Sequence, residues 1–372
     1  MKVIKILTSA LFLVLMISCS SETSKEEKVD EKQMELFLTN MVDVNIIPAF
    51  TNFGTELSKL NTSFTTFSTA STKENLAAVK AQYINTAIAW QKAGLYEGGS
   101  GTRVGPSVVT YLNRFVNVFP TDKQTIDELV GLQEKDDSNY SLSSNFKIQG
   151  LAALDLLFYD SSVDVLAEFS GENKNKRVGH VTAILAKMIE KNNDVVSGWK
   201  KERASFISNT SMAANGSFNK ILNAFSEYYE QKIRKAKLGG PLGKFTQGQE
   251  YPKDIEALYS KQSKKLLVAA HLAILNFYEN GKALSLKTLL KQTAVKSKIS
   301  GKLLSDELSD KLNAVQTKLV AIPATDFETL VKKKDPSLNQ AYTSFVTVVA
   351  MIKSEVIPAF EGTINYVDSD GD

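Results

Sequence analysis

The amino-acid sequence predicts an all-α protein built from two helical bundles, and two observations support this. In KENLAAVKAQYINTAIAWQKAG, apolar residues recur at steps of three and four, which indicates one face of an amphipathic helix: Leu76, Val79, Tyr83, Ala87 and Trp90. The apolar–polar alternation typical of half-buried strands is almost absent. Helices joined by polar loops pack as bundles, so we expect no sheet.

The individual helices follow from the same spacing. The helix that carries Trp90 is expected to begin after an N-cap at Thr72 and to end before Gly98. Pro48 and Pro358 lie within otherwise helical stretches, and each is expected to kink its helix or to follow a break. The other expected helices, in chain order, are residues 31–60, 108–118, 122–132, 177–207, 217–237, 253–279, 284–294, 302–320 and 336–362.

The chain is expected to divide near residues 205–215, where SNTSMAANGS is small and polar. This predicts an N-terminal helical bundle over 33–208 and a C-terminal one over 209–372. NIIPAF in the first helix and EVIPAF in the last are alike, which favours an internal pseudo-repeat. A coincidence of six residues is the alternative.

Residues 1–18 have the pattern of a lipoprotein signal peptide. Lys2 and Lys5 precede an apolar stretch, Ile6–Ile17, that is shorter than the roughly 20 residues of a membrane-spanning helix. The single cysteine, Cys19, follows Met-Ile-Ser as in a bacterial lipobox, so we expect it to be lipidated. A secretory signal with an incidental cysteine is the alternative.

The segment after Cys19 predicts how the protein is attached. Residues 19–32 are polar, charged and free of aromatic residues, which predicts a flexible tether. Ser20 and Ser21, rather than an aspartate, follow the cysteine, and this favours the outer membrane without indicating which face. The expected partners are therefore the membrane, through the lipid, and an envelope protein or a small ligand.

The composition limits the chemistry. The formal net charge is only +3 and the one basic run is Lys332–Lys334, so nucleic-acid binding is not expected. With one cysteine, no disulfide can form within the chain. The two histidines, His180 and His271, leave few donors for a zinc site or a His-based triad. His271 lies among apolar residues and is expected in the core, whereas His180 is expected to be half exposed.

Two glycine-rich loops precede helical segments. EGGSGTRVGPS (97–107) begins with Glu97 and contains Arg103, and KLGGPLGKFTQGQEYP spans 237–252. Neither matches a phosphate-binding or dinucleotide fingerprint. Exposed backbone N–H groups in such loops can hold an anion. The alternative is that the glycines only allow sharp turns.

One acid, Asp155, lies in the apolar segment QGLAALDLLFYD (149–160). A buried carboxylate must be paired or hydrogen-bonded, because an isolated buried charge is very costly. One interpretation is a salt bridge between the two bundles; the other is a cleft carboxylate that binds a polar or cationic ligand beside Arg103. The candidate partners are Arg103, Arg114, Arg234, Tyr96 and Tyr159.

Four segments together resemble the imelysin-like proteins, which are also classed as peptidase family M75. They follow one another in the family's order over most of the chain: AIAWQKAGLYEGGSGTRVGPS, QGLAALDLLFYD, KIRKAKLGGPLGKFTQGQEYPKDIEALYSKQSKKLL and the ending NYVDSDGD. The resemblance implies two related helical bundles around a shared cleft. It also implies an exported protein of a kind often linked to iron uptake.

The sequence departs from the family's hallmark, G-x-H-x-x-E on a helix. Gly150 matches, but Ala152 stands in place of the histidine and Asp155 in place of the glutamate. A histidine and a glutamate three residues apart share a helix face and could share a metal, whereas alanine has no ligand atom. A His-based zinc peptidase site is therefore not expected, and we assign no catalytic residue.

The second half contributes Glu256, Ser260 and Ser263, spaced to share one face of the helix expected to begin at Lys253. The resemblance implies that this acidic-serine run lines the cleft opposite Asp155; a polar solvent face is the alternative. The residues predicted to line a ligand cleft are Glu97, Arg103, Gly150, Asp155, Glu256, Ser260 and Ser263.

The leading functional hypothesis is a lipid-anchored, non-enzymatic binding component that serves metal or small-ligand acquisition at the cell envelope. Any cofactor is unidentified, and a metal ion such as iron is the candidate. The alternatives are a peptidase of the M75 type and a protein-interaction module without a small ligand. An open pocket at Asp155 would favour binding, and a sealed salt bridge would favour the interaction module.

Overall fold

The computed structural model describes residues 29–97, 112–132, 143–279 and 284–366. Within these ranges it contains helices, turns and one isolated β-bridge between Lys296 and Leu303, but no strand, so the all-α prediction is confirmed. None of the described helices is long and apolar enough to cross a membrane. Cys19 and Arg103, with the predictions that rest on them, lie outside the described residues.

The first part of the chain folds around three long helices. Thr72 caps one of them as expected, because its hydroxyl accepts the N–H of Asn75 at 3.2 Å. The elements are α1 (Glu31–Asn40), η1 (Met41–Ile46), α2 (Ile47–Thr69), α3 (Lys73–Ala93), η2 (Gly94–Tyr96), α4 (Leu112–Val116), α5 (Lys123–Leu132), η3 (Ser143–Ile148), α7 (Gly150–Tyr159), α8 (Val165–Glu168) and α9 (Lys174–Ser208).

The second part begins at Ser217, after a turn that follows the end of α9. Its elements are α10 (Ser217–Glu227), η4 (Tyr228–Gly239), α11 (Ser263–Glu279), α12 (Leu286–Gln292), α13 (Leu304–Ala321), α14 (Phe327–Lys332), α15 (Pro336–Met351), η5 (Ile352–Val356) and α16 (Ile357–Ala359). The end of α9 coincides with the expected division of the chain, and the division into two bundles remains a prediction.

Three segments, η1, η4 and η5, are π-helical. The N–H of Ile47 bonds to the carbonyl of Val42, and that of Ile357 bonds to Ile352, which is the i→i+5 pattern of a π-helix. NIIPAF and EVIPAF therefore share a local structure, since each proline follows a widened turn. Proline lacks an N–H and clashes with the carbonyl four residues earlier, so a widened turn before it relieves the conflict.

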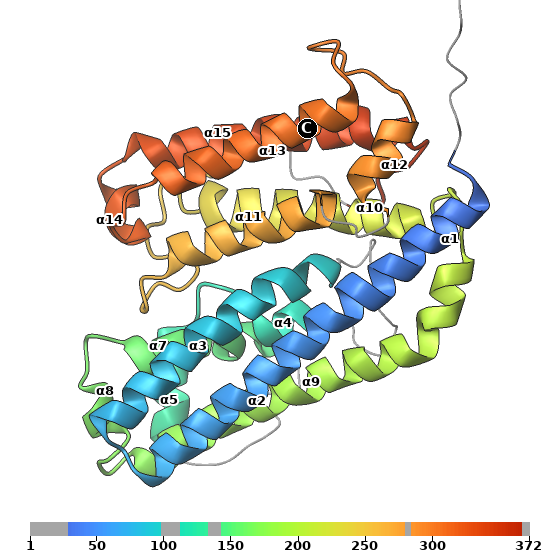
Figure 1. The fold of residues 1–372 in the computed structure, drawn as a ribbon. Coiled ribbons are helices and arrows are strands. Elements are labelled where there is room, and N and C mark those ends of the chain that lie inside the picture. The colour runs from blue at the N-terminus through green and yellow to red at the C-terminus, as the bar shows by residue number, and fades with distance from the viewer. Residues whose placement is uncertain (1–28, 98–111, 133–142, 280–283, 367–372) are drawn as a thin grey trace, which may run out of the picture.

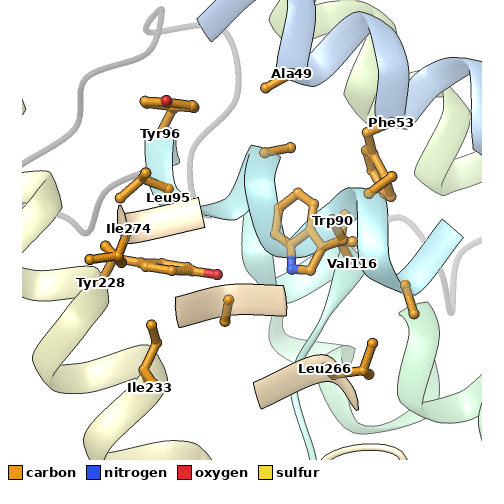
Figure 2. Packing of buried hydrophobic residues seen from close by; sticks show 14 of the residues in the cluster. Ala49, Phe53, Trp90, Leu95, Tyr96, Val116, Tyr228, Ile233, Leu266 and Ile274 are labelled. Atoms are coloured by element: carbon orange, nitrogen blue, oxygen red, sulfur yellow. The ribbon is translucent and has the colours of Figure 1, made fainter. Parts of the chain in front are cut away.

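One continuous core joins the two parts. In Figure 1, α13 and α15 form an outer layer, α10 and α11 a middle layer, and α2, α3 and α9 the layer on the other side. Helix α11 packs on α3. Figure 2 shows Phe53 and Trp90 from the first part in the same cluster as Tyr228 and Leu266 from the second, and all four are buried. The site described below lies along this junction.

Candidate functional site

Gly150 begins α7 and places it against the end of α4. Its φ is +73°, in the left-handed region that glycine adopts without strain. A Cβ at this position would lie 2.5 Å from the carbonyl oxygen of Val116. Gly150 is thus required by local geometry, and it fixes the direction of the helix that carries Ala152 and Asp155.

The buried carboxylate of Asp155 accepts two backbone hydrogen bonds from the second part of the chain. Its Oδ2 lies 2.8 Å from the nitrogen of Tyr259 and its Oδ1 lies 3.1 Å from that of Ser260. Burial raises the pKa of the carboxyl to about 6, and hydrogen bonds from Ser260, Tyr259 and Tyr83 oppose that rise. Asp155 therefore joins α7 to the segment that precedes α11.

The prediction of an arginine partner is wrong for the described residues. Arg114 lies over the ring of Phe146, with its guanidinium carbon 5.6 Å from the ring centroid. Arg234 pairs with Glu230 at 3.0 Å. The carboxylate uses main-chain N–H groups instead, and Arg103 cannot be placed because it lies outside the described residues.

The segment from Lys253 to Gln262 is not the first part of a helix, which corrects the expectation that a helix begins at Lys253. It consists mainly of turns, and α11 starts only at Ser263. Ala257 and Lys261 have positive φ values of 54° and 59°, which no right-handed helix contains. The backbone N–H groups of Tyr259 and Ser260, which lie between these two residues, donate to Asp155 rather than to carbonyls of a preceding turn.

Glu256 lies in a second buried network, which also joins the two parts of the chain. Its side chain pairs with the ammonium of Lys237. It also accepts the side-chain amides of Gln91, at 3.0 Å, and Asn117, at 2.7 Å. Lys237 also donates to the side-chain oxygen Oε1 of Gln91 at 2.9 Å. Burial lowers the pKa of Lys237, and the charge of Glu256 opposes this.

The other predicted residues of the acidic-serine run are also buried. Ser260 and Ser263 are only 8% and 5% exposed, so the alternative of a polar solvent face is wrong. Ser263 donates to the carbonyl of Glu256 at 2.5 Å. Glu97, at the start of the first glycine-rich loop, accepts the backbone N–H of Asn113 at 3.3 Å.

Two adjoining pockets lie along the junction. The first, which we call the Asp155 pocket, has a volume of about 320 Å³ and is lined by Ala152 and Asp155 of α7 and by residues 253–255 and 257–259. The second, the lysine pocket, has a volume of about 460 Å³ and is lined by η4, the end of α3 and the chain after α4. Phe119, Pro120 and Asp254 line both. The structure thus brings the two hallmark positions to one pocket, and Glu256 and Lys237 pair close to the other.

Sequence reasoning missed the polar residues that complete the two networks. Tyr83 was counted among the apolar residues of its helix. Gln91 lies in AIAWQKAGLYEGGSGTRVGPS, one of the segments that resemble the family, but was not identified as a site residue. Asn117 belongs to no recognised motif. Lys237 opens the second glycine-rich loop and ends the basic segment KIRKAK, so the sequence alone does not distinguish it from its basic neighbours. Its partner, Glu256, was predicted as a site residue, but with Asp155 across the cleft rather than with a lysine.

The residues at the hallmark do not fit a resident metal. Ala152 offers no ligand atom, and both oxygens of Asp155 accept backbone N–H groups. Within the described part of the chain, no three or more His, Cys, Asp or Glu residues gather as a metal site would require. His271 is buried as expected, with Nε2 3.0 Å from the carbonyl of Leu312. His180 is only 7% exposed, so its expected half exposure is wrong; it lies inside α9, which packs on α2.

Comparison with known proteins gives the family. The structure is similar to that of an imelysin-like protein from Psychrobacter arcticum 273-4, with a TM-score of 0.70 at 16% identity over 91% of this chain and 98% of that one. It is also similar to a putative iron-regulated protein A precursor from Parabacteroides distasonis ATCC 8503, with a TM-score of 0.72 at 14% identity over 90% and 96% of the two chains. No curated protein matches the sequence. The imelysin model of peptidase family M75 matches residues 46–350, which is most of the chain, and the protein therefore belongs to the imelysin family.

Proposed function

We propose that this protein is a non-enzymatic binding component of iron or small-ligand acquisition at the cell envelope. Its ligand cleft is formed by the Asp155 pocket and the lysine pocket. The observation that carries the proposal is the placement of Ala152 and Asp155, at the hallmark positions, on the wall of a pocket between the two parts of the chain. The name of the Parabacteroides protein, an iron-regulated protein A precursor, supports the link to iron.

A binding role accounts for the site better than peptide hydrolysis does. Metal-assisted hydrolysis needs several ligands and an open coordination position, and alanine stands where the family has a histidine. Asp155 is committed to two backbone N–H groups that hold the junction together. Iron is then the cargo, carried by a ligand in the cleft, rather than a resident cofactor.

We further propose that Cys19 carries a lipid that anchors the protein to the outer membrane, with residues 19–32 as a tether. The signal-like leader and the lipobox-like Met-Ile-Ser-Cys support this. Metabolic labelling with a palmitate analogue is expected to mark the full-length protein and not a Cys19→Ser variant. Equal labelling of both would rule out Cys19 as the anchor.

The binding proposal is tested on the full chain carrying Cys19→Ser. We expect ferric citrate to raise the melting temperature more than iron-free citrate does, and casein to remain uncleaved after prolonged incubation. Asp155→Ala serves as the site variant. Asp310→Ala is the matched control, since that aspartate is exposed and pairs with Lys302 on the surface. Casein cleavage that is lost in Asp155→Ala and kept in Asp310→Ala would overturn the non-enzymatic assignment. A rise no larger with ferric citrate than with iron-free citrate would remove the link to iron.

A further inference from the structure

We infer that the lysine pocket binds a small organic anion that carries carboxylate or phosphate groups. The inference rests on the proposed function, since this pocket is half of the proposed cleft, and it names the chemical class of the ligand. It is carried by the charges on the pocket wall, by the backbone geometry of η4 and by the side-chain amides that also line the pocket.

Three lysines of η4 line the pocket: Lys232, Lys235 and Lys237. The positive charge of Lys237 is balanced by Glu256, because the two side chains form an ion pair and both are only 5% exposed. Lys232 and Lys235 are half buried, and no described carboxylate lies within ion-pair distance of either. The pocket therefore has two cations whose charge is not cancelled by a neighbouring acid.

The backbone of η4 explains why two of these lysines, Lys232 and Lys237, come to one pocket although they are five residues apart. The segment is π-helical over Tyr228–Gly239, and the N–H of Gly240 bonds to the carbonyl of Lys235, five residues earlier, at 2.8 Å. With an i→i+5 repeat, Lys232 and Lys237 come to the same side of the helix. π-helical turns are rare and occur frequently at functional sites.

The charge balance of the pocket favours an anion. Asp254 is the one carboxylate among the described residues that line it, and it lies at the boundary with the Asp155 pocket. Burial raises the pKa of Asp254, and the charge of Lys147 opposes that rise. Two half-buried ammonium groups thus face one acid, and a partly buried cation pair attracts an anion more strongly than the same pair would in bulk water.

Side-chain amides also line the pocket. Asn113 and Asn117 come from α4 and the chain after it, and Gln231 comes from η4 itself. Amide N–H₂ groups donate to carboxylate and phosphate oxygens, as lysine does. Phe245, 38% exposed, lies at the pocket beneath the Lys235 ammonium, which is 5.3 Å from the ring centroid. The ring limits the positions open to that side chain and keeps its charge at the pocket.

The volume of about 460 Å³ lies within the range of roughly 300–1,000 Å³ that small-molecule sites occupy. No arginine is among the described residues that line the pocket, so recognition relies on point charges rather than on a bidentate fork. A compact anion with several oxygens, such as a polycarboxylate or a phosphorylated metabolite, fits these features. Such an anion could also carry a bound ferric ion, which would connect the pocket to the proposed function.

Isothermal titration on the full chain carrying Cys19→Ser tests the inference with two probes, citrate and inorganic phosphate. We expect at least one of them to bind. Tighter binding of citrate would indicate a carboxylate ligand, and tighter binding of phosphate would indicate a phosphorylated one. Absence of binding by both probes would overturn the inference.

The site variant is Lys232→Gln/Lys235→Gln, which is expected to weaken binding of the preferred probe by roughly tenfold or more, since about 1.4 kcal/mol corresponds to a factor of ten. Lys318→Gln/Lys333→Gln is the matched control, because it removes two positive charges at exposed lysines away from the pocket. We expect the control to bind within about twofold of the unchanged chain, as loss of general electrostatic attraction alone would affect both variants alike. An equal loss in the two double variants would overturn the inference.

Lys232→Arg/Lys235→Arg keeps both charges and is expected to retain binding, and it remains informative if the glutamine variant folds poorly. Loss of binding in this variant, with the fold intact by circular dichroism, would contradict recognition by charge. Citrate binding that depends on the two lysines, with no larger rise in melting temperature for ferric citrate than for iron-free citrate, would remove the proposed link to iron and leave the anion site standing. Failure of the two proposals can therefore be told apart.

Discussion

The carboxylate of Asp155 lies 2.8 Å from the backbone nitrogen of Tyr259, a residue 104 positions later in the chain. A second N–H, from Ser260, reaches the other oxygen. Both donors belong to residues 253–262, which consist mainly of turns and contribute one wall of the Asp155 pocket. The acid at the hallmark position thus shapes the pocket as well as lining it.

Replacing Asp155 is expected to destabilise the protein. Asp155→Ala leaves two N–H groups without their acceptor, and an unsatisfied buried donor costs about 1–3 kcal/mol. We expect the free energy of unfolding in urea to fall by about 2–4 kcal/mol. Asp310→Ala, at an exposed position, is expected to change it by less than about 0.5 kcal/mol. A loss at position 155 no larger than that of the control would show that the two hydrogen bonds do not hold the junction.

Alanine substitutions at Gly150 and Gly248 distinguish the cost of backbone strain from the cost of a steric clash. Both have positive φ, +73° and +88°, but a Cβ at Gly150 meets the Val116 carbonyl whereas one at Gly248 meets nothing within 4 Å. Gly248→Ala should cost about 1–2 kcal/mol, from backbone strain alone. Gly150→Ala adds a steric clash and should cost at least about 1 kcal/mol more. Similar melting temperatures for the two variants would contradict a close approach of α7 to α4.

The Lys237–Glu256 pair is expected to show strong coupling in a double-mutant cycle. Removing one partner leaves a buried charge without compensation, so Lys237→Met or Glu256→Leu alone should cost about 3–5 kcal/mol. The double variant should cost less than the sum of the two, because neither charge then remains. Urea unfolding of the four proteins measures the coupling. Additive losses would mean that the two side chains do not interact in the folded protein.

The buried histidine His271 is expected to make stability depend on pH. Burial lowers its pKa from 6.5 to about 4, against the hydrogen bond to Leu312. As the pH falls below 6.5 the unfolded chain takes up a proton that the folded protein refuses until about pH 4, so stability is lost on acidification. The shift corresponds to about 3 kcal/mol.

His271→Gln isolates this contribution. Between about pH 7.5 and 4, the free energy of unfolding of the unchanged chain should fall by about 3 kcal/mol more than that of the variant. The contributions of His180 and of Asp155, whose raised pKa acts in the opposite direction, are common to both proteins and cancel in the difference. Parallel pH profiles would show that His271 is accessible to protons in the folded state.

The helices could be predicted because their signals are local. The apolar spacing around Trp90 and the cap at Thr72 lie within the helix that they specify, and the structure places α3 accordingly. The region after Lys253 carries a helical pattern too, but the acceptor that interrupts it, Asp155, is about a hundred residues away in sequence. No local periodicity reveals such a competitor.

The candidate site was predicted in part for a similar reason. Charge reasoning considered arginine side chains as partners for Asp155 and overlooked main-chain N–H groups, which every residue except proline carries and no motif marks. Glu256 was identified through the family resemblance, yet its partner Lys237 lies in a different element and is brought close by a π-helix that composition does not reveal. The sequence therefore identified Asp155 and Glu256 as candidate site residues. The groups that pair with them could be identified only from the fold.

Pro48 and Pro358 each depend on the one extra residue in the π-helical turn that precedes them. Each π-helical segment holds one residue more than an α-helix of the same reach, so a single-residue deletion within η1 would convert the turn to an ordinary one. The proline ring would then meet the carbonyl four residues before it. A deletion in either segment should therefore be tolerated only when its proline is replaced as well, and relatives that lack the widened turn are expected to lack the proline.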